Sequence, residues 1–213
     1  MKKTGIIIAI IVGIILIWGI GTYNRLVKQQ EAMTTAWGQV ENVYQRRADL
    51  VPNLVALVKN YQEYEQGTIL AVTEARAKAA ATTVNIENYS ESDLQNFQTT
   101  QDNLGNAMNR LIVAVENYPD LKANEEYLTL QAQLAGCENR IQTERERFNE
   151  TAKDYNQSVR KFPSNLIANM FGFEKRPYFE ADEGADTLPK NFPNVTPPNP
   201  HQQPIQPAPQ PRR

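Results

Sequence analysis

The chain has 213 residues, and its 22 Lys and Arg against 24 Asp and Glu give a formal net charge of -2 at pH 7. This length predicts one domain with appendages, and the lack of a basic excess argues against nucleic acid as a partner. The lone Cys137 excludes an intrachain disulfide and leaves the redox compartment open.

The first predicted element is a hydrophobic helix over residues 5–23, preceded by a short tail, residues 1–4. The stretch GIIIAIIVGIILIWGIG carries no charge and as a helix rises about 25 Å, near the thickness of a bilayer core. Trp18 and Tyr23 lie toward one end, where their rings favour the headgroup level. We predict a single-pass transmembrane anchor. The alternative is a cleaved signal peptide, for which Gly19-Ile20-Gly21 supplies a small-x-small site.

The flanking charges bear on the sidedness of this anchor. Lys2, Lys3 and the terminal amine stand against Arg25 and Lys28, which slightly favours the amino terminus inside and the domain outside the cytoplasm.

Small residues share one face of the anchor. Gly5, Ala9 and Gly13 follow one another at steps of four, the spacing that lets two spanning helices approach closely. We therefore predict a membrane self-association face at these residues, against the alternative of a chance spacing.

Beyond the anchor, apolar residues recur at alternating steps of three and four, the coiled-coil period. This period favours long helices that cross at shallow angles, so we predict an all-α fold, an antiparallel four-helix bundle over residues 24–180. The expected seam positions are, helix by helix, Leu26, Gln30, Met33, Trp37, Val40, Tyr44; Leu50, Leu54, Leu57, Tyr61, Tyr64, Thr68, Val72, Ala75; Leu94, Phe97, Gln101, Leu104, Met108, Leu111, Val115, Tyr118; and Tyr127, Leu130, Leu134, Cys137, Ile141, Phe148, Tyr155, Phe162.

Helix breaks are predicted from capping residues and prolines. Asp49 can cap the second helix with Pro52 in its first turn, so the bundle is expected to turn near Ala48. Ser90 or Ser92 opens the third helix. Tyr118-Pro119-Asp120 ends it, and the fourth helix then reaches Phe162 before Pro163.

Two further segments follow the fourth helix. Residues 164–173, SNLIANMFGF, are apolar, and we expect them to pack on the end of the bundle, with docking on the membrane surface as the alternative. Residues 181–213 are rich in Pro with Gln and Asn between, and we predict a disordered, polyproline-like tail.

The residues of the predicted bundle supply little chemistry. A di-iron site needs Glu-x-x-His on two helices, and the only histidine, His201, lies in the tail. Cys137 occupies a seam position and lacks a histidine to activate it, so it is expected to be a core residue. We therefore predict no enzyme activity, no cofactor and no metal site.

Charged residues near the seams form a candidate inter-helix polar network. Its members are Arg47, Asp49, Arg76, Glu138 and Arg145. A buried Glu138 would need a cation, and Arg76 or Arg47 is the expected partner. Register specification is one role, and a set of solvated flanking charges is the alternative.

Several stretches together carry a resemblance to a known family. They are YNRLV (23–27), AWGQV (36–40), RRADLVPNLVALVKNY (46–61), TEAR (73–76), YPDLKAN (118–124), CENRI (137–141), RFN (147–149), YNQSVRKFP (155–163) and the YF pair 178–179. In their order and spacing the chain resembles the LemA family of bacterial membrane proteins.

The resemblance implies a protein of the bacterial inner (cytoplasmic) membrane with a single span and a long four-helix domain, and it brings no enzyme activity or cofactor. It suggests a role in envelope organisation or stress. We therefore expect a membrane-anchored, non-catalytic scaffold whose partners are the lipid bilayer, further copies of itself and other membrane proteins. The alternative is a tethered ligand- or partner-binding module with a cavity created by Ala71, Ala75 and Ala79.

Overall fold

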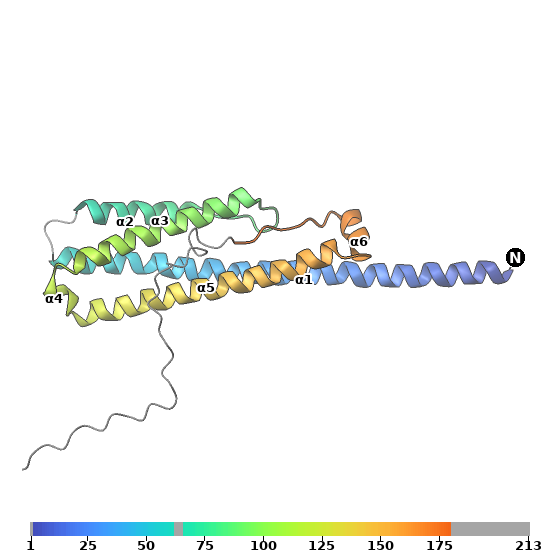
Figure 1. Cartoon of the computed structure of the whole chain (residues 1–213), viewed down its shortest axis with the longest axis horizontal. Coiled ribbons are helices and arrows are strands. Elements are labelled where there is room, and N and C mark those ends of the chain that lie inside the picture. The colour runs from blue at the N-terminus through green and yellow to red at the C-terminus, as the bar shows by residue number, and fades with distance from the viewer. Residues whose placement is uncertain (1, 62–65, 180–213) are drawn as a thin grey trace, which may run out of the picture. The chain divides into compact units, whose positions relative to one another are not determined.

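The computed structural model describes residues 2–61 and 66–179, and within these ranges every regular element is a helix. The long helices are α1 (Lys2–Tyr61), α2 (Gln66–Ala81), α3 (Glu91–Val115) and α5 (Glu125–Arg160) (Figure 1). Two short helices, α4 (Pro119–Lys122) and α6 (Ser164–Phe171), follow α3 and α5. The predicted all-α class is confirmed, whereas the predicted disordered tail, residues 181–213, lies outside the described residues.

Helix α1 runs without interruption through Pro52 to Tyr61. The predicted turn near Ala48, with Asp49 as the cap of a new helix, is therefore wrong. A residue at position 52 would normally donate its amide to the carbonyl of Ala48, but proline has no amide hydrogen. Arg76 of α2 donates its Nε to that carbonyl oxygen at 2.9 Å. A side chain thus replaces the missing backbone bond, and the helix continues.

The buried face of α1 also continues through the predicted break. After Tyr44, Arg47, Val51, Leu54 and Val58 are buried, again at steps of three and four, and Ala48 beside Arg47 is buried as well. The next helix starts only at Gln66, and residues 62–65, with the predicted seam residue Tyr64, lie outside the described residues. Leu50 and Leu57, predicted as seam residues, are only partly buried. They flank the buried face because the continuous helix sets a different register.

Helices α3 and α5 begin at capped residues. Ser90 accepts at its Oγ from the Asp93 amide at 3.2 Å and donates its own amide to Asp93 Oδ2 at 2.9 Å. This reciprocal capping box confirms Ser90 as the start of the third long helix. Asn124 caps α5 through its Oδ1, which accepts from the amides of Glu126 at 2.8 Å and Tyr127 at 3.1 Å.

The seams of α3 and α5 are buried almost as predicted. In α3 the buried residues are Leu94, Phe97, Gln101, Leu104, Met108, Leu111 and Val115. In α5 the predicted seam from Tyr127 to Tyr155 is buried. Phe162 is the exception, because α5 ends at Arg160 and the Phe162 side chain is 75% exposed.

The long helices pack in pairs. Helix α1 lies along α5, and α2 lies along α3 and also contacts α1. Residues early in α1 contact residues late in α5, and later α1 residues contact earlier ones. Arg25 binds Ser158, and Arg47 binds Glu138. One apolar cluster combines residues of α1, α2, α3, α4 and α5, and a second combines α1, α3 and α5 with Phe179.

The amino-terminal part of α1 extends beyond these clusters. It is the one helix of the described residues that is long and apolar enough to cross a membrane, and none of its apolar stretch is buried by other helices. Helix α6 contacts both α1 and α5, in agreement with the expected packing of residues 164–173 on the end of the helical domain.

Candidate functional site

A buried guanidinium, that of Arg47 on α1, joins three helices. Its side chain is 5% exposed. Its Nη2 donates to the main-chain oxygen of Gln101 at 2.7 Å and to Gln101 Oε1 at 3.2 Å. Its Nη1 donates to Glu138 Oε2 at 3.1 Å. A buried cation is tolerated only with such partners, so α3 and α5 must keep one register against α1 for these bonds to form.

Gln101 extends this site from α3 to α2. Its Nε2 donates to the main-chain oxygen of Ala79 at 3.4 Å, while its Oε1 accepts from Arg47. One turn later Gly105 lies beside the guanidinium, and a Cβ there would be in van der Waals contact with Arg47 Nη1 at 3.4 Å. Gln101 was absent from the network predicted from sequence. A polar residue in an otherwise apolar seam was the signal for it.

The charges of this site are unevenly exposed. The Glu138 side chain is 53% exposed, so the buried member of the pair is the cation rather than the carboxylate. The Tyr44 ring lies 5.1 Å from Arg47 Cζ. Burial raises the pKa of Tyr44 to about 12, and the nearby Arg145 and Arg47 oppose this effect. Tyr44 is therefore neutral at physiological pH and presents its ring to the guanidinium.

The other predicted network residues lie apart from this pair. Arg76 Nη2 is 4.0 Å from Asp49 Oδ1, and both side chains are partly exposed, so their ion pair adds little. The stronger contact of Arg76 is the one to the Ala48 carbonyl. Arg145 stacks on Phe179, with Cζ 5.0 Å from the ring centroid. Of the predicted members, Arg47 thus pairs with Glu138 at 3.1 Å, and Arg76 pairs more weakly with Asp49.

Two asparagines of α5 hold the segment that follows α6. Asn149 donates Nδ2 to the Phe179 carbonyl at 3.1 Å and accepts from the Phe179 amide at 2.9 Å. Asn156 makes the same pair of bonds with the backbone of Arg176, both at 2.8 Å. The seven-residue spacing puts both amides on one face of α5. Sequence reasoning missed this role, although both residues lie in stretches that carry the family resemblance.

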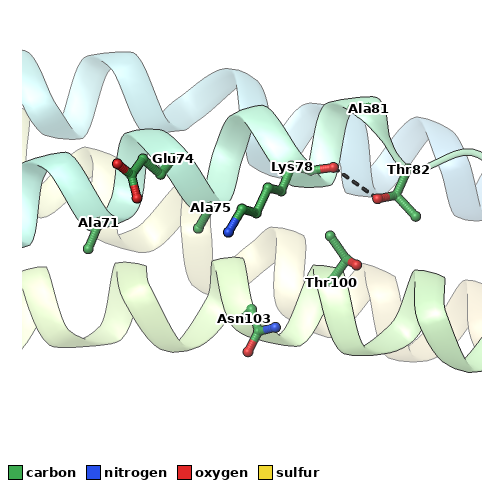
Figure 2. A pocket seen from close by; sticks show the side chains of 8 residues that line it. All are labelled: Ala71, Glu74, Ala75, Lys78, Ala81, Thr82, Thr100 and Asn103. Carbon is green, nitrogen blue, oxygen red and sulfur yellow. Dashed lines mark hydrogen bonds between the residues drawn. The ribbon is translucent and has the colours of Figure 1, made fainter.

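A hollow of about 510 Å³ lies between α2 and α3. Its lining residues are Ala71, Glu74, Ala75, Lys78, Ala81, Thr82, Thr100 and Asn103. In Figure 2, Ala71 and Ala75 point from α2 toward α3, and the Lys78 side chain extends into the space between the two helices. Ala79, the third alanine predicted to create a cavity, is buried and does not line this hollow.

The small-residue face of the anchor is open. Among the described residues, a Cβ at Gly5 or Gly13 would meet nothing within 4 Å beyond its own helix. Ala9 is exposed on the same helix. The structure therefore leaves this face available to a partner helix without identifying one.

Reactive side chains are sparse in the described part of the chain. Across residues 2–61 and 66–179 there is no group of three or more His, Cys, Asp and Glu that fits a metal ion. Cys137 is buried at its seam position, and His201 lies outside the described residues. The arrangement suits packing and positioning of helices.

Comparisons with known proteins agree with this picture. The model of the LemA family matches residues 36–195. Magnetosome protein MamQ 2 of Paramagnetospirillum magneticum is 28% identical over 78% of this chain and 67% of its own length. Magnetosome protein MamQ of Magnetospirillum gryphiswaldense is 27% identical over the same shares. Protein LemA of Metamycoplasma hominis is 23% identical over 81% of this chain and 75% of its own length.

Proposed function

The chain belongs to the LemA family, and on that premise we propose that it is a membrane-anchored, non-catalytic helical scaffold of the bacterial cell envelope that assembles with copies of itself. Residues 5–23 are the anchor and residues 24–180 are the helical domain. None of the relatives' names refers to a chemical reaction. We also propose, from the resemblance to that family, a role in envelope organisation with other membrane proteins as further partners.

The continuity of α1 carries this proposal. One helix of 60 residues includes both the exposed apolar stretch and the buried seam of the domain. At about 1.5 Å per residue it measures roughly 90 Å. Because no loop separates the anchor from the domain, the direction of the span fixes the direction of the domain. An anchor and a domain joined in this way suit a part whose orientation matters, such as a subunit of an assembly.

We propose an antiparallel four-helix bundle for the domain, formed by α1, α2, α3 and α5. The contacts of Arg25 with Ser158 and of Arg47 with Glu138 support an antiparallel arrangement of α1 and α5. The apolar cluster to which all four helices contribute supports the bundle. The bonds of Arg47 to Gln101 and Glu138 then specify the register of three helices.

Self-association is proposed to use the small face Gly5, Ala9 and Gly13. The test compares full-length protein in mild detergent with the variant Gly5→Leu/Ala9→Leu/Gly13→Leu, by mass measurement and electron microscopy. The parent is expected to form a defined oligomer, and the variant a smaller species, because leucines keep the helix backbones apart. Ile7→Leu/Ile11→Leu, on the opposite face of the same helix, is the matched control and should assemble like the parent.

A monomeric mass for the full-length parent, both in mild detergent and after crosslinking in membranes, would contradict the scaffold proposal. An oligomer that persists in the triple variant would place the interface elsewhere on the chain.

The domain is proposed to lie outside the cytoplasm, since Lys2, Lys3 and the amino terminus carry the larger positive charge. The test labels a cysteine at the exposed position Val113 in intact cells with a membrane-impermeant maleimide. Labelling without permeabilisation is expected, whereas labelling only after permeabilisation would reverse the orientation. The buried Cys137 is the internal control, because it should stay unlabelled in the folded protein.

A tethered ligand-binding module is the second candidate function, and the hollow between α2 and α3 favours it. Thermal-shift measurements with small molecules derived from the envelope would detect it, since a ligand that binds the native state raises the melting temperature. The variant Ala71→Leu/Ala75→Leu fills the hollow and should abolish any such shift.

A further inference from the structure

Helix α6 lies against α1 at the point where the apolar stretch ends. The Tyr23 ring is 4.8 Å from the Phe171 ring and 5.7 Å from the Phe173 ring, centroid to centroid. A Cβ at Gly19 would lie 3.6 Å from Ile167 Cδ1. Between residues 5 and 23 the helix rises about 27 Å, close to the thickness of a hydrocarbon core. Helix α6 is therefore at the height where a membrane spanned by α1 gives way to headgroups.

One side of α6 is packed. Ala168 is fully buried with Leu26, Tyr155 and Val159, and Ile167 packs against this cluster. Gly172 ends α6 in the left-handed conformation, with φ 74°, and its amide donates to the Ala168 carbonyl. The packed side explains why α6 keeps one position on α1 and α5, but it uses only part of the apolar surface of this short helix.

The other side of α6 exposes large apolar side chains. Leu166 is 57% exposed and Met170 is 67% exposed, and Phe162, just before the helix, is 75% exposed. Leu166 and Met170 are four residues apart on α6, so they form one stripe, and Phe162 precedes the helix. Phe171 adds to this surface at 54% exposure. Contiguous apolar surface of this kind on a protein marks a site of interaction.

Cations flank the stripe. Arg160 and Lys161 precede it and are exposed, and Lys175 follows it and is also exposed. Glu174 is the single acidic residue between positions 160 and 176, and α6 itself carries no charge. Apolar side chains with aromatic residues and flanking cations are the composition of segments that lie in the membrane interface, where cations contact anionic headgroups.

We propose that α6, with Phe162, is a second membrane contact that lies in the headgroup–acyl boundary of the bilayer crossed by α1. The inference rests on the proposed anchor and goes beyond it. The lipid surface is the occupant, because the exposed Phe171 of α6 contacts Tyr23 at the end of the exposed apolar stretch of α1. Two contacts, one through the span and one beside it, fix the rotation of α1 about its axis relative to the membrane surface.

Site-directed spin labelling of the full chain tests this proposal. Single cysteines replace Leu166 or Met170 in a Cys137→Ala background, and the protein is placed in nanodiscs of phosphatidylethanolamine and phosphatidylglycerol. Oxygen concentrates in lipid and a water-soluble nickel chelate is excluded from it. The ratio of their effects on the label therefore reports immersion. Val113→Cys and Leu70→Cys are matched controls, since both side chains are as exposed as Leu166 and lie away from α6.

We expect the ratio of the oxygen effect to the nickel effect to be severalfold higher at Leu166 and Met170 than at Val113 and Leu70. A label at Val12 in the apolar stretch separates the two proposals. If Val12 is immersed while Leu166 and Met170 match the controls, the α6 inference is wrong and the anchor stands. If Val12 also matches the controls, the anchor itself is wrong.

A second copy of the chain is the competing occupant of the stripe. Nanodiscs that hold a single chain distinguish it from lipid. Immersion of Leu166 and Met170 that persists in such discs supports the bilayer as the occupant. Immersion that appears only when several chains share a disc would overturn the proposal. Circular dichroism of each labelled variant, compared with the unlabelled chain, verifies the fold.

Discussion

Two stretches of α1 differ in apolar content and have opposite surroundings. In the stretch from Ile6 to Ile20 the large apolar side chains are exposed, whereas in the stretch from Leu26 to Val58 the seam residues are buried by other helices. Both stretches are α-helical, so they differ in what surrounds their side chains and not in secondary structure. The first stretch is apolar all round, as in a helix long enough to cross a membrane, while the second is apolar on one face and is covered by protein.

Polar residues follow the same division. Residues 5–21 have no charge, so nothing there needs a partner. The second stretch includes Arg47 and Pro52, and each depends on side chains of other helices: Arg47 on Gln101 and Glu138, and the carbonyl freed by Pro52 on Arg76. The domain half of α1 is thus defined by its tertiary contacts and the anchor half by its surroundings.

The largest expected effect separates the two stretches directly. Leu54→Ala is expected to lower the free energy of unfolding by about 2–5 kcal/mol, because Leu54 is 1% exposed and its loss leaves a cavity. Leu16→Ala, at a position 60% exposed, is the matched substitution and should change it by less than about 0.5 kcal/mol. Urea unfolding in mild detergent, followed by circular dichroism, measures both. Equal effects would contradict the division of α1.

Removal of the Gln101 side-chain acceptor of Arg47 comes next, while the Gln101 main-chain oxygen stays in place. Gln101→Leu is expected to lower the free energy of unfolding by about 2–3 kcal/mol, because a buried guanidinium loses a partner. Arg47→Met in the same chain should recover most of this loss, since the cation is then gone. Chemical denaturation of the single and double variants measures the coupling. Asn109→Leu, at an exposed position of α3, is the control, and an equal loss there would count against the role of Gln101.

A smaller effect tests the link between Pro52 and Arg76. Arg76→Met is expected to lower the free energy of unfolding by about 1 kcal/mol, because the Ala48 carbonyl loses the donor that replaces the missing amide of Pro52. In a Pro52→Ala background the cost should fall, since an alanine amide can bond to that carbonyl. A double-mutant cycle from thermal unfolding gives the coupling. Identical costs in both backgrounds would show that Arg76 acts in another way.

The smallest effect at neutral pH concerns Tyr44. Burial raises its pKa to about 12 from an ordinary value of 10.0, so the folded state keeps the phenol proton where the unfolded chain loses it. This contribution to stability is complete below pH 10 and is lost as the pH rises through about 12. The difference in stability between the parent and Tyr44→Phe, followed by denaturation across that range, measures it. A difference that stays constant with pH would contradict the assignment.

Sequence periodicity predicted most of the buried residues but misplaced one boundary. The seam of α3 from Leu94 to Val115 is buried as predicted. Apolar residues at regular steps of three and four lie on one face of a helix, and that face packs against the other helices. The break at Ala48 was wrong, because a local signal, Asp49 followed by Pro52, was outweighed by a tertiary bond from Arg76. Without that break, the steps from Tyr44 put Arg47 on the buried face, where the structure has it.

By itself, the sequence determined the helical class, the apolar stretch at residues 5–21, the capped start of α3 and the family, since these depend on local periodicity, local hydrogen bonds and motif order. Only the tertiary structure decided that Arg47 binds Gln101 and Glu138, that Asn149 and Asn156 hold the backbone after α6, and that α6 exposes its stripe beside Tyr23. Those contacts join residues far apart in the chain, and helical spacing fixes the face of one helix but not which residue of another helix lies opposite it.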